Sequence, residues 1–374
     1  MTFPRRLGTG GAFPPKEAAL PRVPNAALLI AGHATFILMG AAYALYGPAL
    51  PIYRDMFGLA AGAAGLMVSA HWVGAFAAVA AQMANVRFTE RHALGLLAAG
   101  AAIIAAQPGW AVMVLGAAVL GAGYGLCATL YNRRYLIEFG VRGPAMVGVV
   151  NAVFGVGAIA APLVLVALGN APMPVFAGVA VLVLAVLPIA RPGPAEARQG
   201  ADPLRLRPEM VLAALTIGCE ALSTGLGPTG LVGRGLGQAA AGTWTSAFFI
   251  AFMAGRISLY WVADRVPARR LLRVALAGLA LASLAALVLP GPGYVAAGLF
   301  TGLLFPSLFV VASGAMGSSQ RATSTIIISG LAGGIVMPAL FGGLIALVGA
   351  AVLFALLAGY ALLVLGASFV LIRA

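Results

Sequence analysis

Four ionisable side chains lie inside long apolar stretches of this sequence: His33, His71, Glu220 and Arg256. A carboxyl group surrounded by apolar residues favours its protonated form, and it releases the proton when water or a cation reaches it. An imidazole exchanges protons near neutral pH. These residue types therefore predict proton exchange, with Glu220, His33 and His71 as the candidate carriers. The structural alternatives are a glutamate paired with a cation and neutral histidines bonded to backbone carbonyls.

Polar side chains elsewhere in the apolar stretches predict a binding site for a small molecule. Thr216, Ser223 and Thr224 lie about one helical turn from Glu220, so they would form a polar stripe with it. Arg256 either binds an anionic group or, in the alternative, pairs with an acid or extends toward water. The candidate substrate-binding residues are Tyr124, Tyr131, Asn132, Asn151, Thr216, Thr224 and Arg256.

Metal and enzyme chemistry have weaker support in the sequence. Met67 and His71 are four residues apart, and Met39 and Cys219 are also available, which would suit a soft metal ion. Methionine at helical spacing is more often a packing residue, so we predict no metal site. The sequence has no Gly-rich phosphate loop ending in Gly-Lys-Ser/Thr and no clean metal-binding motif. We therefore expect no enzyme and no cofactor.

The composition explains where these polar groups lie. Of 374 residues, 62% are hydrophobic and only 8% are charged, whereas soluble domains have about 25% charged residues. Twelve apolar stretches are each long enough to cross a bilayer, where a chain must form helices or a closed barrel. We predict an all-α membrane protein with transmembrane helices at 25–48, 60–84, 93–107, 109–137, 143–169, 173–190, 209–230, 239–263, 271–289, 293–316, 322–347 and 349–372.

The basic residues set the expected orientation. Twenty of the 22 Lys and Arg residues fall on one side of these stretches, and only Arg54 and Arg234 fall on the other. Loops rich in Lys and Arg remain in the cytoplasm, so both termini are expected there. A single lysine, Lys16, beside 21 arginines indicates a GC-rich bacterial genome. We expect a monomeric, multi-pass protein of the bacterial inner membrane, with the lipid bilayer and no nucleic acid as a partner.

The chain also contains an internal repeat. Gly157–Pro162 matches Gly333–Pro338, and a Gly-Pro step at 47–48 recurs at 227–228, with nearly the same separation along the chain. In this repeat, Gly40 stands at the position equivalent to Glu220. We predict a cytoplasmic tail at 1–24, a six-helix bundle at 25–190, a cytoplasmic linker at 191–208 and a second six-helix bundle at 209–374. Duplicated halves commonly hold a substrate between them.

An acidic residue and a basic cluster follow the eighth stretch, at Asp264, Arg265, Arg269 and Arg270. This segment resembles the cytoplasmic loop motif of the major facilitator superfamily, and Gly255-Arg256 resembles its fucose-permease-like carriers. The first-half copy of the motif has Asn85 in place of the acid. The resemblance implies cytoplasmic gates formed by Arg133, Arg134 and Glu138 on the fourth helix and by Asp264, Arg265 and Arg269 after the eighth.

The resemblance implies the fold of that superfamily, with two pseudo-symmetric six-helix bundles. It also implies a secondary active transporter that works by alternating access. With the proton-exchanging residues, the expected function is proton-coupled uptake of a small organic solute. The alternatives that remain open are an exporter of a drug-like or metabolite compound, a soft-metal importer, and a non-transporting membrane assembly factor.

Overall fold

The computed structural model describes residues 26–60, 63–84, 86–139, 143–191, 193, 206–262, 265–316 and 320–372. All regular elements within these ranges are helical. The predicted tail at 1–24 lies outside the described residues, as does most of the predicted linker at 191–208. Asp264 of the predicted second gate lies outside them too.

The first half of the chain forms six helices: α1 (Ala26–Phe57), α2 (Ala63–Met83), α3 (Glu90–Ala106), α4 (Trp110–Glu138), α5 (Gly143–Ala167) and α6 (Pro172–Val186). The second half forms α7 (Pro208–Gly225), α8 (Gly227–Gly233), α9 (Gln238–Val262), α10 (Ala268–Ala285), α11 (Pro290–Met316), α12 (Gln320–Val348), the short 3₁₀ helix η2 (Ala350–Val352) and α13 (Leu353–Leu371). Each predicted stretch therefore corresponds to one helix, except that the seventh is divided into α7 and α8.

Among the differences from the predicted boundaries, two involve proline. The first helix was expected to end at Pro48, but α1 continues through Pro48 and Pro51 to Phe57. Transmembrane helices tolerate proline because neighbouring groups satisfy the freed backbone carbonyl. The seventh stretch was expected to be continuous, but α7 and α8 meet at a bend of 50° just before Pro228. At this bend Pro228 has no N–H to donate to the helix, and glycines flank the same position, so the helix breaks.

The surface of the helices suits a lipid environment. Seven helices in the described ranges are long and apolar enough to cross a membrane, and the bent α7–α8 pair makes an eighth candidate. The helix α6, with 15 residues, is a shorter apolar helix. Large aliphatic side chains are exposed on the outside, such as Leu115 on α4 and Leu281 on α10, at 65% and 68% exposure. This pattern is expected where hydrocarbon chains replace water.

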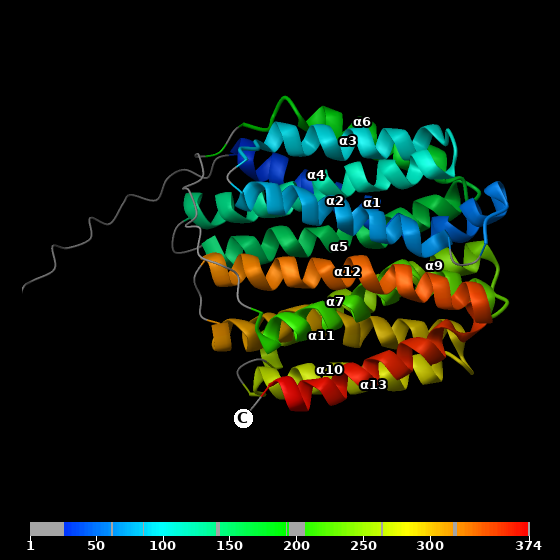
Figure 1. Ribbon diagram of the computed structural model, residues 1–374. Coiled ribbons are helices and arrows are strands. Elements are labelled where there is room, and N and C mark those ends of the chain that lie inside the picture. Colours follow the sequence, from blue (N-terminus) through cyan, green and yellow to red (C-terminus); the bar gives the residue numbers. More distant parts are fainter. Residues whose placement is uncertain are drawn as a thin grey trace, which may run out of the picture.

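The helices run side by side along one direction, with α3 and α6 at one edge and α10 and α13 at the opposite edge (Figure 1). The helices α3, α6, α10 and α13 pack against helices of their own half. Contacts between the halves come from α1, α2 and α5 on one side and α7, α8, α9 and α12 on the other. The interior between the halves is therefore lined by helices that carry the polar residues singled out from the sequence.

Two contacts between the halves have the same design. On the α2–α12 seam, Ser69 Oγ donates a hydrogen bond to the carbonyl oxygen of Ile335 (2.7 Å). On the α9–α5 seam, Ser246 Oγ donates to the carbonyl oxygen of Ile159 (2.8 Å). The two donors are separated along the chain by almost the same interval as the two acceptors, and this interval is that of the internal repeat. The repeat thus places equivalent hydrogen bonds on both seams.

Glycine and proline complete this repeated design. Each acceptor carbonyl lies three residues before a proline, Pro338 or Pro162. Each serine follows a glycine by four residues, Gly65 or Gly242. A Cβ atom at Gly65 would overlap the carbonyl oxygen of Pro338, and one at Gly242 would lie 2.7 Å from Val166 Cγ2. Small residues therefore allow the two halves to approach closely at both seams.

Candidate functional site

A cavity of about 80 Å³ lies between the two halves. Four first-half helices (α1, α2, α4 and α5) and two second-half helices (α7 and α9) contribute to its wall. More than half of the lining side chains carry aromatic rings, and two carry charges. The lining residues are Phe36, Met39, Tyr43, Trp72, Tyr124, Ala128, Asn151, Phe154, Glu220, Thr224, Phe249, Phe252 and Arg256.

The two charges form an ion pair on the second-half wall. Glu220 Oε1 on α7 lies 3.3 Å from Arg256 Nη2 on α9, and the side chains are 18% and 26% exposed. The guanidinium of Arg256 lies over the ring of Phe252, 4.4 Å from its centroid, which adds a cation–π attraction. Glu220 Oε2 and Arg256 Nε have no hydrogen-bond partner in the described part of the chain. The pair therefore has one acceptor and one donor that are buried without a partner in the described part of the chain.

A hydroxyl network ties α1 to the helix that carries Glu220. Thr224 Oγ1 donates to the carbonyl oxygen of Glu220 (2.8 Å), because the two residues are one turn apart on α7. The hydroxyls of Tyr43 and Thr224 are 2.7 Å apart. Since Thr224 donates to the backbone, Tyr43 is the donor of this second bond. Tyr43 was not predicted as a site residue, because a tyrosine in an apolar stretch resembles an ordinary packing residue.

His71 lies one layer behind the cavity wall. It is fully buried, and its ring centroid lies 4.9 Å from that of Tyr124, which lines the cavity. His71 Nδ1 lies 3.3 Å from the hydroxyl of Tyr46, and Nε2 has no partner among the described residues. The lining residues do not include His71, so any role in binding would act through the aromatic ring in front of it.

His33 is held near the start of α1, away from the cavity lining. Its Nδ1 lies 2.8 Å from the carbonyl oxygen of Leu29, one turn earlier, and 3.0 Å from the hydroxyl of Tyr135 on α4. The structure therefore brings neither predicted histidine into direct contact with Glu220.

The predicted substrate-binding residues divide into two groups. Tyr131 and Thr216 are fully buried and lie outside the lining. Asn132 also lies outside it, and its Oδ1 accepts a hydrogen bond from Asn151 Nδ2 (2.8 Å). The other four line the cavity: Tyr124, Asn151, Thr224 and Arg256.

The residues weighed for a soft metal ion differ in their relation to the cavity. Met39 lines the cavity, whereas Met67 and Cys219 are fully buried. The described residues contain no group of three or more His, Cys, Asp or Glu side chains placed to hold a metal ion.

The predicted gate on α4 forms a cluster within the first half. Arg134 Nε lies 2.6 Å from Glu138, and Arg134 Nη1 lies 3.2 Å from Glu90 at the start of α3. Arg134 also donates to the carbonyl oxygen of Arg191, and Glu90 Oε2 accepts from the N–H of Gly193 (3.1 Å). The cluster thus joins α3, α4 and the chain after α6. Glu90 was missed because an acid in the first turn of a helix is usually explained by the helix dipole.

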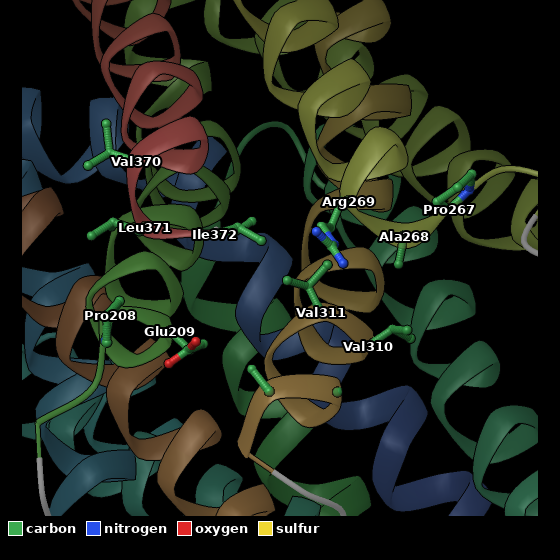
Figure 2. Close-up of a pocket in the computed structure, with 12 residues that line it drawn as sticks. Pro208, Glu209, Pro267, Ala268, Arg269, Val310, Val311, Val370, Leu371 and Ile372 are labelled. Atoms are coloured by element: carbon green, nitrogen blue, oxygen red, sulfur yellow. The ribbon is translucent and has the colours of Figure 1, made fainter. Parts of the chain in front are cut away.

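Arg133 is half-buried beside this cluster on α4. After α9, Arg265 donates to the carbonyl oxygen of Trp261. Arg269 lines an open groove of about 730 Å³ between the ends of α7, α10, α11 and α13. Figure 2 shows Glu209 on one wall of this groove and Arg269 on another, with aliphatic side chains around them. The predicted second gate therefore lies at the edge of the second half, with Asp264 outside the described residues.

Comparisons with known proteins agree with this architecture. The nucleoside transporter NupG, as a point mutant, superimposes with a TM-score of 0.74 at 15% identity, over 93% of this chain and 100% of that chain. The D-xylose-proton symporter gives 0.74 at 15% identity, over 93% and 98%. The E. coli fucose:proton symporter FucP gives 0.59 at 16% identity, over 92% and 98%. At these identities the likeness establishes the fold.

The sequence search against curated proteins gives no match. The family model described as Major Facilitator Superfamily matches residues 33–332. This range includes Glu220, Arg256 and every other residue of the cavity wall. The chain belongs to the Major Facilitator Superfamily of transporters.

Proposed function

We propose that this protein is a proton-coupled secondary transporter that takes up a small organic solute across the bacterial inner membrane. The observation that carries the proposal is the Glu220–Arg256 ion pair, which faces a cavity between the two halves. It acts as a monomer, since one chain encloses the whole cavity. Both termini lie in the cytoplasm, in keeping with the distribution of arginine.

Glu220 is the proton carrier in this proposal. When the carboxyl is ionised, Arg256 compensates its charge at 3.3 Å. An unpaired buried charge is costly, so separating the pair favours protonation of Glu220. Arg256 stays charged throughout, because a guanidinium does not lose its proton in proteins. Solute binding that draws Arg256 away thereby loads a proton on Glu220, and the two halves then carry both across.

Proteins of similar structure support the direction and the coupling in this proposal. Two of them are symporters of a sugar and protons, and another is a nucleoside transporter. The aromatic and amide groups of this cavity suit an organic solute. The predicted gate residues Arg133, Arg134, Glu138, Arg265 and Arg269 would close the cytoplasmic side during the cycle.

The test uses the full chain in proteoliposomes loaded with a pH-sensitive dye. D-xylose, uridine and lactate are added outside in turn, with protein-free vesicles as the control for passive entry. We expect at least one solute to acidify the lumen, and an imposed pH gradient to accumulate that solute. Glu220→Gln should lose at least tenfold of the gradient-driven accumulation and retain solute exchange.

Two results would overturn the proposal. One is unchanged pH-driven accumulation in Glu220→Gln, which would remove the proton-carrying role. The other is solute movement in the direction opposite to proton flow, because that would make the protein an exporter.

A further inference from the structure

We infer that the cavity takes a small organic monocarboxylate with an apolar body, bound together with one proton. The inference deepens the proposed function and rests on its proton-exchanging Glu220. It starts from the unequal chemistry of the two charges in the wall.

Only one member of the ion pair can change its charge. Glu220 becomes neutral when it takes a proton, whereas Arg256 remains a cation. Among the described lining residues there is no second carboxylate and no second cation. Protonation therefore leaves one uncompensated positive charge in a site with low exposure to water. A monoanion restores neutrality there, whereas a cationic ligand would compete for Glu220 and leave Arg256 unpaired.

The guanidinium geometry fits a carboxylate. Arg256 Nη2 binds Glu220 Oε1, while Arg256 Nε, on the same edge of the guanidinium, has no partner in the described residues. A carboxylate can accept two parallel hydrogen bonds from one guanidinium edge. A substrate carboxylate that takes this edge replaces Glu220 and improves on its single hydrogen bond.

Several of the remaining polar groups of the wall are already occupied, whereas the indole Nε1 of Trp72 has no partner among the described residues. Both N–H groups of Asn151 are used, by Asn132 Oδ1 and by the carbonyl oxygen of Val147, each at 2.8 Å. Tyr43 and Thr224 bond each other. Beyond this one N–H donor, a polyol would have to break the bonds of Asn151, Tyr43 and Thr224, because each buried hydroxyl needs a partner of its own. The many aromatic rings of the wall instead suit an apolar body.

The size of the cavity favours a short ligand. Its volume of about 80 Å³ is well below the roughly 300–1,000 Å³ of pockets for drug-sized molecules. We therefore choose three probes of equal length that differ in charge: butyrate, butyramide and butylamine.

The test measures binding to the purified full chain by titration calorimetry. Each titration is done in two buffers with different ionisation enthalpies, which counts the protons taken up on binding. We expect butyrate to bind with uptake of about one proton. We expect butyramide to bind at least tenfold more weakly and butylamine not to bind.

Variants separate the roles of the two charges. Arg256→Gln should lose butyrate binding at least tenfold, and Arg256→Lys, which keeps the charge without the two-donor edge, should lose less. Glu220→Gln mimics the protonated acid, so it should bind butyrate without proton uptake and with little dependence on pH. The matched control is Arg234→Gln, an exposed arginine outside the cavity, which should bind butyrate as the parent does.

The outcomes distinguish this inference from the proposed function. Equal binding of butyrate and butyramide, unchanged butyrate binding in Arg256→Gln, or no binding of any probe would overturn the carboxylate assignment. A proton-coupled sugar or nucleoside flux would still stand in that case. Conversely, butyrate binding through Arg256 without proton uptake would keep the carboxylate site and reject Glu220 as the proton carrier.

Discussion

The two halves of this transporter resemble each other where they meet and differ where they line the cavity. At the seams, Ser69 and Ser246 make equivalent hydrogen bonds at 2.7 and 2.8 Å. In the cavity, the first half supplies rings and Asn151, and the second half supplies both charges. The repeated features thus lie where the halves meet, whereas the unequal features lie in the cavity wall, to which we assign binding and coupling in the proposed function.

The packing explains why the first half has no matching acid. In the internal repeat, Gly40 of the first half is equivalent to Glu220 of the second half. A Cβ atom at Gly40 would overlap the backbone carbonyl oxygen of Phe154. The helices α1 and α5 pack too closely there for any side chain. Both charges of the cavity wall therefore come from the half in which α7 leaves room for a side chain.

The strongest way to break this comparison is Arg256→Gln, which leaves Glu220 as a buried charge without its partner. We expect transport to be lost and the free energy of unfolding near pH 8 to fall by about 2 kcal/mol, less than for a fully buried pair because both groups are partly exposed. Acidification neutralises the carboxyl, so the loss should shrink at pH 5. Thermal unfolding in detergent at both pH values measures this.

The double variant Glu220→Gln/Arg256→Gln is the control for that prediction. It should unfold later than Arg256→Gln alone, because no charge is left unpaired. A single variant that is equally stable at pH 5 and pH 8 would show that the pair is not electrostatically coupled.

A second prediction compares the close approaches on the two seams. Gly65→Ala should destabilise the protein by about 1–3 kcal/mol, because the new methyl group meets a backbone oxygen that cannot move away. Gly242→Ala should cost less, since the neighbouring atom belongs to the side chain of Val166. Unfolding midpoints of the two variants test the order, and the reverse order would contradict the backbone contact assigned to Gly65 and the side-chain contact assigned to Gly242.

The seam hydrogen bonds give a third, smaller pair of effects. Ser69→Ala and Ser246→Ala should each destabilise the state in which the two halves are in contact at the end where α1 ends and α2 begins. The expected loss of stability is about 0.5–1 kcal/mol for each variant. The rate at which an impermeant maleimide labels Met39→Cys from that side should rise a few-fold in each variant. Cys127 and Cys219 are buried and give the background. Unequal effects would contradict the equivalence of the seams.

The smallest effect is expected for Tyr43→Phe. The ring stays in the cavity wall, and only its hydrogen bond to Thr224 is lost. Solute affinity should change by less than about 1 kcal/mol, which binding assays of the parent and the variant can resolve. Thr224→Val should match it, because it removes the other member of the same bond.

Sequence patterns predicted the helices better than the cavity. Hydropathy located every helix, because each apolar stretch must satisfy its own backbone within the bilayer. It missed the continuation of α1 through Pro48 and the break before Pro228, since proline ends a helix only where the surroundings do not compensate.

For the site, the useful signal was the cost of a charge in an apolar stretch. It found Glu220 and Arg256, and the structure brings those two together. Trp72 and Phe249 could not be predicted as wall residues, because an aromatic ring looks the same facing a cavity, a helix or lipid. His71 was singled out for its chemistry, but only tertiary packing shows that Tyr124 stands in front of it.

The serine bonds at the seams have a consequence for how the molecule opens at the face where α1 ends and α2 begins. When the halves part there, the hydroxyls of Ser69 and Ser246 lose their carbonyl acceptors, and water has to replace those acceptors because a buried hydroxyl without a partner is costly. Opening then requires water to enter both seams at the same time. Solutes that lower water activity, such as sucrose, should hold this face shut.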